Sequence, residues 1–401
     1  MTERFDVVVV GLGGLGSATA WQLARRGARV LGLERFALGH VRGASHGDSR
    51  IIRLSYHSPG YVANAREAYA DWADLAADSG VPQVTRCGGA DIFPVGAAIP
   101  LADYAEAMTA EGVPFELLDA GTSRRRFPAL AVPDGADVLY SERSGYVQPS
   151  AATATMQRRA IAHGAVLREH SQVVELVQLV DGPVGRGGPG RVDAGVRVRC
   201  ADGSTFEAGS AVVTADAWTN QVLAGLDVTL PLTVTKEQVV HFDVRGREAT
   251  HTAPVMPIWI WMDDPSYYGF PTVGEPTVKV GQDCGGDPID PDLRDFEPMA
   301  GALDRMRAFV QEVIPGAGEV TRVTTCLYTL TPDRDFVAGL VPGHERVTVG
   351  LGAAHGFKFA PWFGRVLADL ATLGTTSSDL AAMQLDRPAL TDPSAPARWL
   401  V

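Results

Sequence analysis

A glycine-rich turn near the N-terminus has the residue types and spacing of a dinucleotide-binding site. The run Val7–Val10 leads into Gly11, Gly13 and Gly16, a helix-favouring segment follows, and a second apolar run ends at Glu34. The glycines would allow a tight turn, a close approach of the backbone to a pyrophosphate, and close packing of helix on strand. Glu34 could accept hydrogen bonds from a ribose. The motif predicts a βαβ unit that binds FAD or NAD, and the alternative is a glycine-rich turn without a ligand.

Lysine is rare enough in this chain to be informative. Only three of the 35 basic residues are lysines, namely Lys236, Lys279 and Lys358. A chain that uses arginine as its general surface cation is expected to keep lysine where a compact, titratable ammonium is needed. Lys279 lies in the middle of a predicted strand and faces either a cavity or solvent, and Lys358 stands between two phenylalanines. Chance is the competing explanation for each.

Composition limits the class of protein. The 401 residues are 46% hydrophobic and 20% charged, which is typical of a globular protein with about two domains. A net charge of −12 argues against nucleic acid or an anionic membrane as a partner, so a small anionic substrate would need local cations. We expect no transmembrane segment or signal peptide. The four cysteines show no metal-ligand spacing and read as reduced thiols of a cytoplasmic protein.

The elements that must position these residues follow from the hydrophobic pattern. A polar, glycine-rich segment, His40 to Tyr56, carries Arg50 and Arg53, which would share a face if the segment is helical. The stretch Pro231 to Val280 alternates like antiparallel sheet. The low-complexity segment Asp181 to Gly195 reads as a hairpin tip without a function. Helices are expected at 61–77, 101–111, 149–164 with a Ser150 cap, 293–314 and 363–373.

A set of short motifs carries a resemblance to a known family. VVVVGLGGLG, SHGDSRIIR, AWTNQVL, YYGFP, TTCLYTLTPDRDF and AHGFKF occur in the order and approximate spacing of the monomeric sarcosine oxidase family. This family of FAD-dependent amine and amino-acid oxidases has the fold of glycine oxidase and D-amino-acid oxidase, and it includes N-methyltryptophan oxidase. The resemblance covers nearly the whole chain and implies FAD, not NAD.

The resemblance also implies a fold and a division of the chain. We expect an α/β protein, α+β overall, in which a Rossmann-like FAD-binding domain is interleaved with an antiparallel-sheet substrate domain. The FAD-binding domain would comprise 1–85, 148–220 and 321–401, and the substrate domain 86–147 and 221–320. The protein would be a monomer.

Roles for the reactive residues follow from the same resemblance. Cys326, which by itself would read as a small buried hydrophobe, is implied to form a thioether to the flavin 8α carbon. Lys279 is implied to stand near the flavin and to assist reduction of O2, and Arg53 and Lys358 to clamp a substrate carboxylate. Arg50 would lie over the flavin ring.

The remaining candidates are less specific. His46 fits the loop beside the flavin, and His355 lies in a glycine-rich turn, although a single histidine is more often structural than catalytic. Tyr268 and Tyr56 are expected as walls of the substrate pocket, although aromatic residues in a sheet usually belong to the core.

Two positions depart from the family pattern. Asp283 stands where sarcosine and N-methyltryptophan oxidases have a histidine, and it would attract a cationic amine or a hydroxyl group of the substrate. Asp216 stands where a glycine is usual. The identity of the substrate therefore stays open.

The resulting expectation is an FAD-dependent oxidase of a secondary amino acid, N-methylated or cyclic. A hydride equivalent passes to the flavin and leaves an imine, and O2 is then reduced to hydrogen peroxide. The main alternative is a tailoring oxidase, or a dehydrogenase with another electron acceptor, that acts on a larger biosynthetic amine or a cyclic imino acid. A non-catalytic flavin-binding protein is a third reading, and the first motif alone would also allow an NAD-dependent dehydrogenase.

Overall fold

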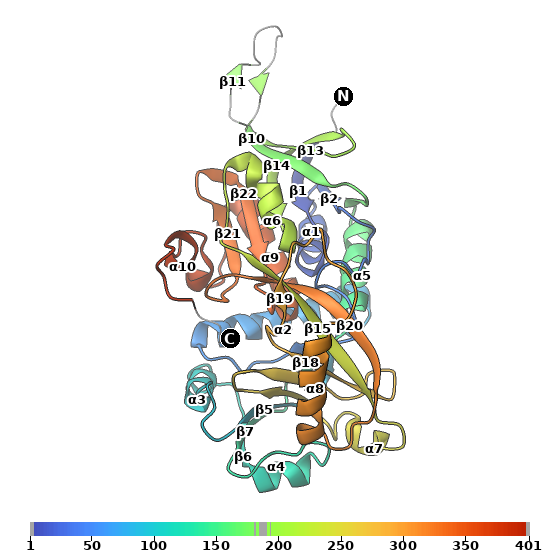
Figure 1. The fold of residues 1–401 in the computed structure, drawn as a ribbon. Helices are drawn as coiled ribbons and strands as arrows, with labels where there is room; N and C mark the ends of the chain where they lie inside the picture. The colour runs from blue at the N-terminus through green and yellow to red at the C-terminus, as the bar shows by residue number, and fades with distance from the viewer. Residues whose placement is uncertain (1–3, 180–181, 184–190, 193, 398–401) are drawn as a thin grey trace.

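Two large sheets and a small one organise the chain (Figure 1). The computed structural model describes residues 4–179, 182–183, 191–192 and 194–397. Most of the expected hairpin tip from Asp181 to Gly195 lies outside the described residues, apart from the pairing of β11 (Gly182–Pro183) with β12 (Arg191–Val192). Within the described ranges, no helix is both long and apolar enough to cross a membrane.

The first large sheet has a parallel centre. β1 (Arg4–Val10) pairs in parallel with β2 (Val30–Leu33) on one side and with β14 (Thr205–Val213) on the other. Val7 to Val10 are all buried because hydrophobic clusters cover both faces of this strand, which explains a continuous apolar run. The sheet also contains parallel β9 (Val166–Arg168) and β22 (His344–Leu351), and antiparallel β10 (Val173–Leu179), β13 (Gly195–Cys200) and β21 (Val337–Val341).

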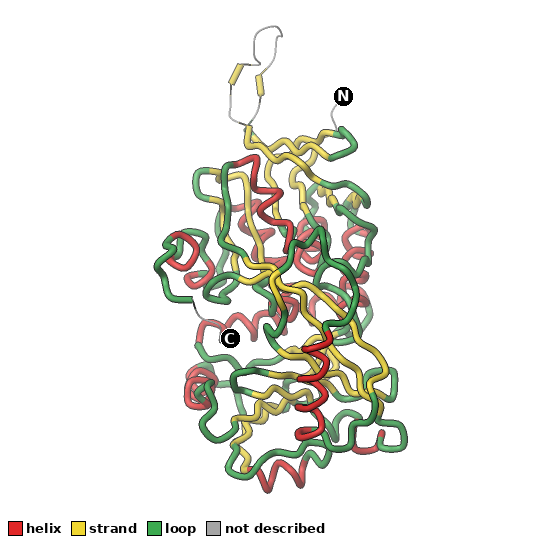
Figure 2. Tube along the Cα trace, in the orientation of Figure 1, coloured by secondary structure: helices red, strands yellow, loops and turns green. Residues whose placement is uncertain are grey.

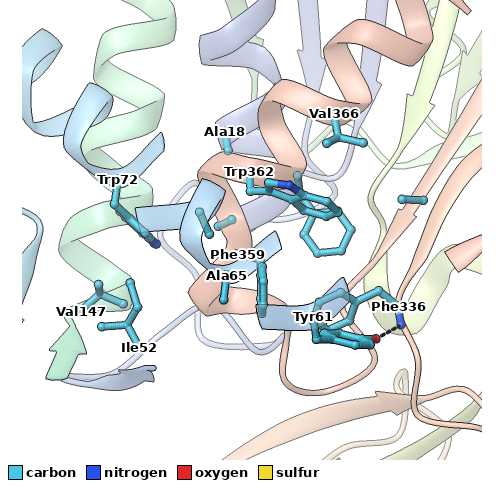
Figure 3. Packing of buried hydrophobic residues seen from close by; sticks show 14 of the residues in the cluster. Ala18, Ile52, Tyr61, Ala65, Trp72, Val147, Phe336, Phe359, Trp362 and Val366 are labelled. Atoms are coloured by element: carbon cyan, nitrogen blue, oxygen red, sulfur yellow. Dashed lines mark hydrogen bonds between the residues drawn. The ribbon is translucent and has the colours of Figure 1, made fainter. Parts of the chain in front are cut away.

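A group of helices packs beside this sheet and forms the largest core. α1 (Gly14–Arg25) lies against α5 (Pro149–Ala162) and α9 (Ala360–Leu373), and α9 also contacts α2 (Pro59–Ser79). Several buried aromatic rings of this cluster come from α2, α9 and the turn before α9, as Figure 3 shows for Trp72, Trp362 and Phe359. These helices hold the glycine turn and the turn that carries Lys358 against one another.

The second large sheet is antiparallel except where β16 pairs in parallel with β5. α8 (Ala300–Val313) packs on it, and Phe309 stacks on Tyr267 with ring centroids 3.8 Å apart. Figure 2 shows this helix lying along the strands. The strands are β5 (Gly89–Phe93), β6 (Glu116–Asp119), β7 (Asp137–Ser141), β15 (Thr233–Asp243), β16 (Ile258–Trp261), β17 (Tyr267–Phe270), β18 (Thr277–Gln282), β19 (Asp287–Pro288) and β20 (Val320–Leu330).

A small antiparallel sheet joins these layers. It contains β3 (Arg50–Ile52), β4 (Val84–Arg86) and β8 (Gly145–Val147). The shorter helices at the periphery are α3 (Leu101–Ala110), α4 (Ala120–Arg126), α6 (Thr219–Leu223), α7 (Glu248–His251) and α10 (Pro388–Thr391).

The expected fold class is confirmed, and two local predictions are wrong. The condition under which Arg50 and Arg53 would share a helix face is not met, because β3 pairs with β8 through backbone hydrogen bonds. The helix expected from position 293 begins at Ala300, since Pro298 disfavours helical backbone before it. Ser150 does not cap α5, because the N-cap is Gln148. Ser150 Oγ instead accepts a hydrogen bond from the amide of Gly47 at 3.0 Å.

The contact between α1 and α9 gives a prediction for stability. A Cβ on Gly364 would lie 2.6 Å from the carbonyl carbon of Ala18, so Gly364→Ala must push the two helices apart. We expect a loss of about 1–3 kcal/mol and a lower thermal midpoint. Gly301→Ala in α8 is the matched control, because its nearest neighbour is the flexible Arg305 Nη1 at 3.8 Å. A thermal midpoint of Gly364→Ala at or above that of the control would contradict the predicted clash.

Candidate active site

The glycine turn predicted from the sequence forms at the carboxyl end of β1. Gly11 has a φ of +90°, a conformation that residues with a side chain rarely adopt. A Cβ on Gly16 would lie 1.8 Å from the carbonyl oxygen of Gly11, so glycine is required where α1 meets the turn. The amide of Gly14, the first residue of α1, donates to Ser45 Oγ at 2.8 Å. The N-terminus of α1 is thus placed to receive a pyrophosphate.

Glu34 directly follows β2 and is buried beside this turn. Its carboxylate accepts hydrogen bonds from the amides of Leu12 at 2.8 Å and Phe36 at 3.0 Å, and His40 Nε2 lies 3.3 Å away. Burial by itself raises the pKa of Glu34, but His40 and the two amides outweigh it, and the net pKa is below its usual value. The carboxylate therefore stays ionised, as binding of a ribose hydroxyl requires.

Three adjoining pockets lead from the glycine turn to the antiparallel sheet. The turn pocket, of about 910 Å³, is lined by Gly11, Gly13 and Glu34 among others. The middle pocket, of about 630 Å³, shares Gly13 with it and reaches Tyr328 of β20. The cationic pocket, of about 770 Å³, shares Arg50 and Tyr328 with the middle pocket. This continuous path, with a glycine cradle at one end, fits an extended dinucleotide such as FAD.

Arg53 lines the cationic pocket and is 5% exposed. Its Nη1 lies 3.7 Å from Asp91 Oδ1, and its guanidinium lies 5.0 Å from the ring centroid of Tyr56. Burial lowers the pKa of Arg53, but Asp91, Tyr104 and Tyr56 together raise it above its usual value, so the cation persists. Sequence analysis missed Asp91. Tyr56, expected in the pocket wall, is instead fully buried behind Arg53 and does not line the pocket.

Lys358 and His355 come from the turn that precedes α9. Burial and the neighbouring Arg53 lower the pKa of Lys358 to about 7. His355 Nε2 lies 3.0 Å from the carbonyl oxygen of Arg334, and its ring centroid lies 4.4 Å from that of Phe336. Burial, Lys358 and Arg334 hold the pKa of His355 well below its usual value. The imidazole is therefore neutral and donates its Nε2 proton to a backbone carbonyl.

Asp283 lines the same pocket but is not alone there. Arg334 Nη2 lies 3.1 Å from Asp283 Oδ2, and the side chain of Arg334 is only 4% exposed. Burial lowers the pKa of Arg334, but Asp283, Cys284 and Tyr328 together raise it above its usual value, so the guanidinium stays charged. Sequence analysis missed Arg334, because it lies in a turn, within the motif TPDRDF, where charged residues are common.

Arg50 and Tyr268 lie where the middle and cationic pockets meet. Arg50 donates to the backbone carbonyls of Ser49 at 2.9 Å and Ala44 at 2.8 Å, which fixes its guanidinium. The hydroxyl groups of Tyr268 and Tyr328 lie 3.3 Å apart. Burial raises the pKa of Tyr268, so this pair is made of neutral phenols. Tyr328 was not singled out from the sequence, although it is two residues from Cys326.

Lys279 and Cys326 are buried in the antiparallel sheet next to these pockets. Lys279 Nζ donates to the carbonyl of Ser49 at 2.6 Å and lies 4.1 Å from the ring centroid of Phe270. Burial and Arg50 hold its pKa well below the usual value. Lys279 is thus not a solvent-facing sheet residue. Burial raises the pKa of Cys326, although Arg50 opposes this effect, and the residue precedes Leu327 of the middle pocket.

His46 and Asp216 lie on the cofactor side of the site. His46 is buried with a pKa lowered to about 3 by burial and by Arg50, and its Nε2 has no hydrogen-bond partner among the described residues. Asp216 lines both the turn and middle pockets with a φ of +47°, which explains why glycine would suit this position. Burial raises the pKa of Asp216 to about 6, against a hydrogen bond from Thr329.

Comparisons with known proteins agree with this geometry. Residues 6–370 match the family model described as FAD dependent oxidoreductase. The chain is 36% identical to monomeric sarcosine oxidase of Streptomyces avermitilis over 94% of this chain and 96% of that protein. It is 29% identical to N-methyl-L-tryptophan oxidase of Salmonella heidelberg, over 96% and 99%. The solved structure of NikD, an unusual amino acid oxidase essential for nikkomycin biosynthesis, superposes with a TM-score of 0.82 at 28% identity, over 96% and 98%.

The buried ammonium of Lys358 gives a pH-dependent prediction for stability. Its pKa of about 7 in the folded protein is below the ordinary value of 10.5. The folded protein therefore bears the cost of the buried charge below pH 7, and this cost disappears as the pH rises toward 10.5. We expect Lys358→Met to raise the thermal midpoint in the absence of ligand, most at pH 6 and least at pH 10. A gain that grows with pH would contradict the burial of a charged lysine.

Proposed function

The chain belongs to the family of FAD dependent oxidoreductases, and on this premise we propose that it oxidises a secondary amino acid, N-methylated or cyclic, with O2 as the electron acceptor. The relatives identify it as an FAD-dependent amine oxidase of the sarcosine oxidase group, and the substrate is the part that we propose. The observation that supports this proposal is the cationic pocket, which is lined by both Arg53 and Lys358 and shares Arg50 and Tyr328 with the middle pocket.

FAD would be held by the glycine turn and Glu34 at one end and by the residues around Arg50 at the other. When bound, FAD supplies an acceptor for two electrons from the C–H bond next to the amine and a route for them to O2. The net reaction converts the amine and O2 into an imine and hydrogen peroxide, and water hydrolyses the imine. Charged and backbone groups of the chain then have to bind and orient the substrate.

Arg53 and Lys358 bind the substrate carboxylate in this proposal. The carboxylate of Asp91 forms an ion pair with Arg53, so the guanidinium keeps its charge and orientation. The positive potential of Arg50, Arg53 and Lys358 disfavours a further positive charge on the substrate amine. The amine therefore loses its proton on binding and can be oxidised without a dedicated base, which agrees with the neutral, backbone-bonded state of His355.

Lys279 would act on oxygen. Its ammonium is fixed by the carbonyl of Ser49 and the ring of Phe270, beside Arg50. A positive charge held there stabilises the negative charge that develops on O2 as it accepts electrons. The lowered pKa of Lys279 also suits donation of a proton to reduced oxygen.

A larger biosynthetic amine or a cyclic imino acid is the second candidate substrate. The observation that favours it is the ion pair of Asp283 and Arg334 in the pocket, which sarcosine, having no side chain, would leave without a substrate group to bind. The similarity to NikD supports the same reading.

We also propose a domain division, an oligomeric state and a cellular location for the chain. The division into an FAD-binding domain (1–85, 148–220 and 321–401) and a substrate domain (86–147 and 221–320) is supported by the strands of the parallel and antiparallel sheets. β20 is the exception, since it pairs with β15 in the antiparallel sheet. The similarity to monomeric sarcosine oxidase supports a monomer, and the four free cysteines agree with a reducing cytoplasm.

Peroxide release in air tests the reaction. Sarcosine, N-methyl-L-tryptophan, L-proline and L-pipecolate should be compared, and at least one should yield hydrogen peroxide and bleach the bound flavin without oxygen. Lys358→Met should reduce kcat/KM for that substrate by about 30-fold or more, because a buried carboxylate loses a charged partner. An N-methyl amine without a carboxylate is the control and should lose far less. Flavin that no member of the panel reduces would refute the proposed substrate class.

Covalent attachment of FAD through Cys326 is a separate proposal with its own test. On acid precipitation, flavin should stay with the wild-type protein, whereas Cys326→Ser should release it all into the supernatant. Cys200→Ser is the control, because this buried thiol lies in β13 and should leave the attachment intact. Flavin released from the wild type, or retained by Cys326→Ser, would refute attachment at this residue.

A further inference from the structure

Asp283 and Arg334 form an ion pair inside the cationic pocket. Their closest atoms, Oδ2 and Nη2, are 3.1 Å apart, and the Asp283 side chain is 30% exposed. Both residues line the pocket together with Ser266 and Lys358. A carboxylate and a guanidinium therefore stand side by side where a substrate would bind, and the carboxylate is not an isolated negative charge.

The turn between β20 and β21 directs Arg334 into the pocket. Arg334 has a φ of +65°, and its carbonyl oxygen accepts the hydrogen bond from His355. The two acidic neighbours in the turn have other partners: Asp333 pairs with Arg387 at 2.7 Å, and Asp335 accepts from Tyr61 Oη at 2.8 Å. Of the three consecutive charged residues, Arg334 is thus the one committed to the pocket.

The other groups that face Asp283 do not replace Arg334. Tyr268 and Tyr328 are neutral, because burial raises their pKa values. Burial and the neighbouring Asp283 raise the pKa of Glu237 to about 7, against a hydrogen bond from Thr235. Asp283 raises the pKa of Lys358, but burial and Arg53 have larger effects and lower it.

The neighbouring thiol is also neutral, since burial and Asp283 raise the pKa of Cys284. Arg50 and His355 also line the cationic pocket, and both donate hydrogen bonds to backbone carbonyls. Arg334 is therefore the counter-ion that neutralises Asp283.

We propose that Asp283 and Arg334 form a subsite for a neutral hydrogen-bonding group of the substrate, such as a carboxamide, and that Arg334 determines this specificity by excluding a cation. This inference rests on the proposed oxidation of a secondary amino acid. It also revises the expectation that Asp283 attracts a cationic amine.

Electrostatics favours a neutral group over either charged one. A second ammonium on the substrate would gain from Asp283 but would be repelled by Arg334 and by Lys358. A second carboxylate would gain from Arg334 but would meet Asp283. A carboxamide carries both a donor and an acceptor and so matches the ion pair without disturbing it.

Three probes of similar length test the subsite: Nα-methyl-L-glutamine, Nα-methyl-L-glutamate and Nα-methyl-L-ornithine. Affinity is measured from the absorbance change of the bound flavin, and kcat/KM from flavin reduction without oxygen. The wild type should favour the glutamine derivative by about tenfold over each of the other two. Arg334→Gln should shift the ratio of ornithine to glutamine derivative by about tenfold toward ornithine, since Asp283 then lacks its counter-ion.

Two further variants separate specificity from a general structural effect. Arg334→Lys keeps the charge and should keep the preference for the neutral probe. Arg334→Gln combined with Asp283→Asn removes both charges and should restore that preference. A purely structural role would weaken all probes alike and leave their ratios unchanged.

The outcomes distinguish this inference from the proposed function. If sarcosine or proline reduces the wild-type flavin and the probe ratio of Arg334→Gln stays within about twofold of wild type, the subsite is refuted and the oxidase remains. A wild type that is reduced by sarcosine but binds none of the three probes also refutes the subsite. A flavin that no secondary amino acid reduces refutes both.

Discussion

The burial of positive charge is the constraint on which the rest of the site depends. The chain carries a net charge of −12, yet it concentrates cations around three adjoining pockets. An unpaired buried cation would cost several kcal/mol, so each needs a fixed partner. Two arginines lie against carboxylates, and Arg50 and Lys279 donate to backbone carbonyls of the segment that leads into β3. The partners are Asp91, Asp283, Ala44 and Ser49.

Burial and the positive charge of neighbouring residues determine the protonation states of the groups nearby. They keep His46 and His355 neutral and lower the pKa of Lys358 toward neutral pH, where a bound carboxylate would restore the ammonium. In the proposed reaction, the same positive charges favour loss of the proton from the substrate amine. The substrate carboxylate would then be the counter-ion of the pocket, and its binding would prepare the amine for oxidation.

The sequence predicted the cofactor half of the site better than the substrate half. Gly11, Gly16 and Glu34 act through local backbone geometry, which spacing along the chain encodes directly. Asp91 and Arg334 gain their importance from partners on distant strands and turns, so no local pattern marks them. The conformation of the segment with Arg50 and Arg53 was left open for the same reason: it is decided by the pairing of β3 with β8, which lies far along the chain.

The two halves of the site cannot form independently of each other. Arg50 and Tyr328 line both the middle and the cationic pocket, so the groups that would surround the flavin ring also shape the substrate pocket. Arg294 donates to the carbonyls of Val41, beside the turn pocket, and Thr325, next to Cys326. A ligand that binds only the folded arrangement stabilises every contact that arrangement needs. A cofactor bound along this path would therefore also stabilise the substrate pocket, because the same residues line both.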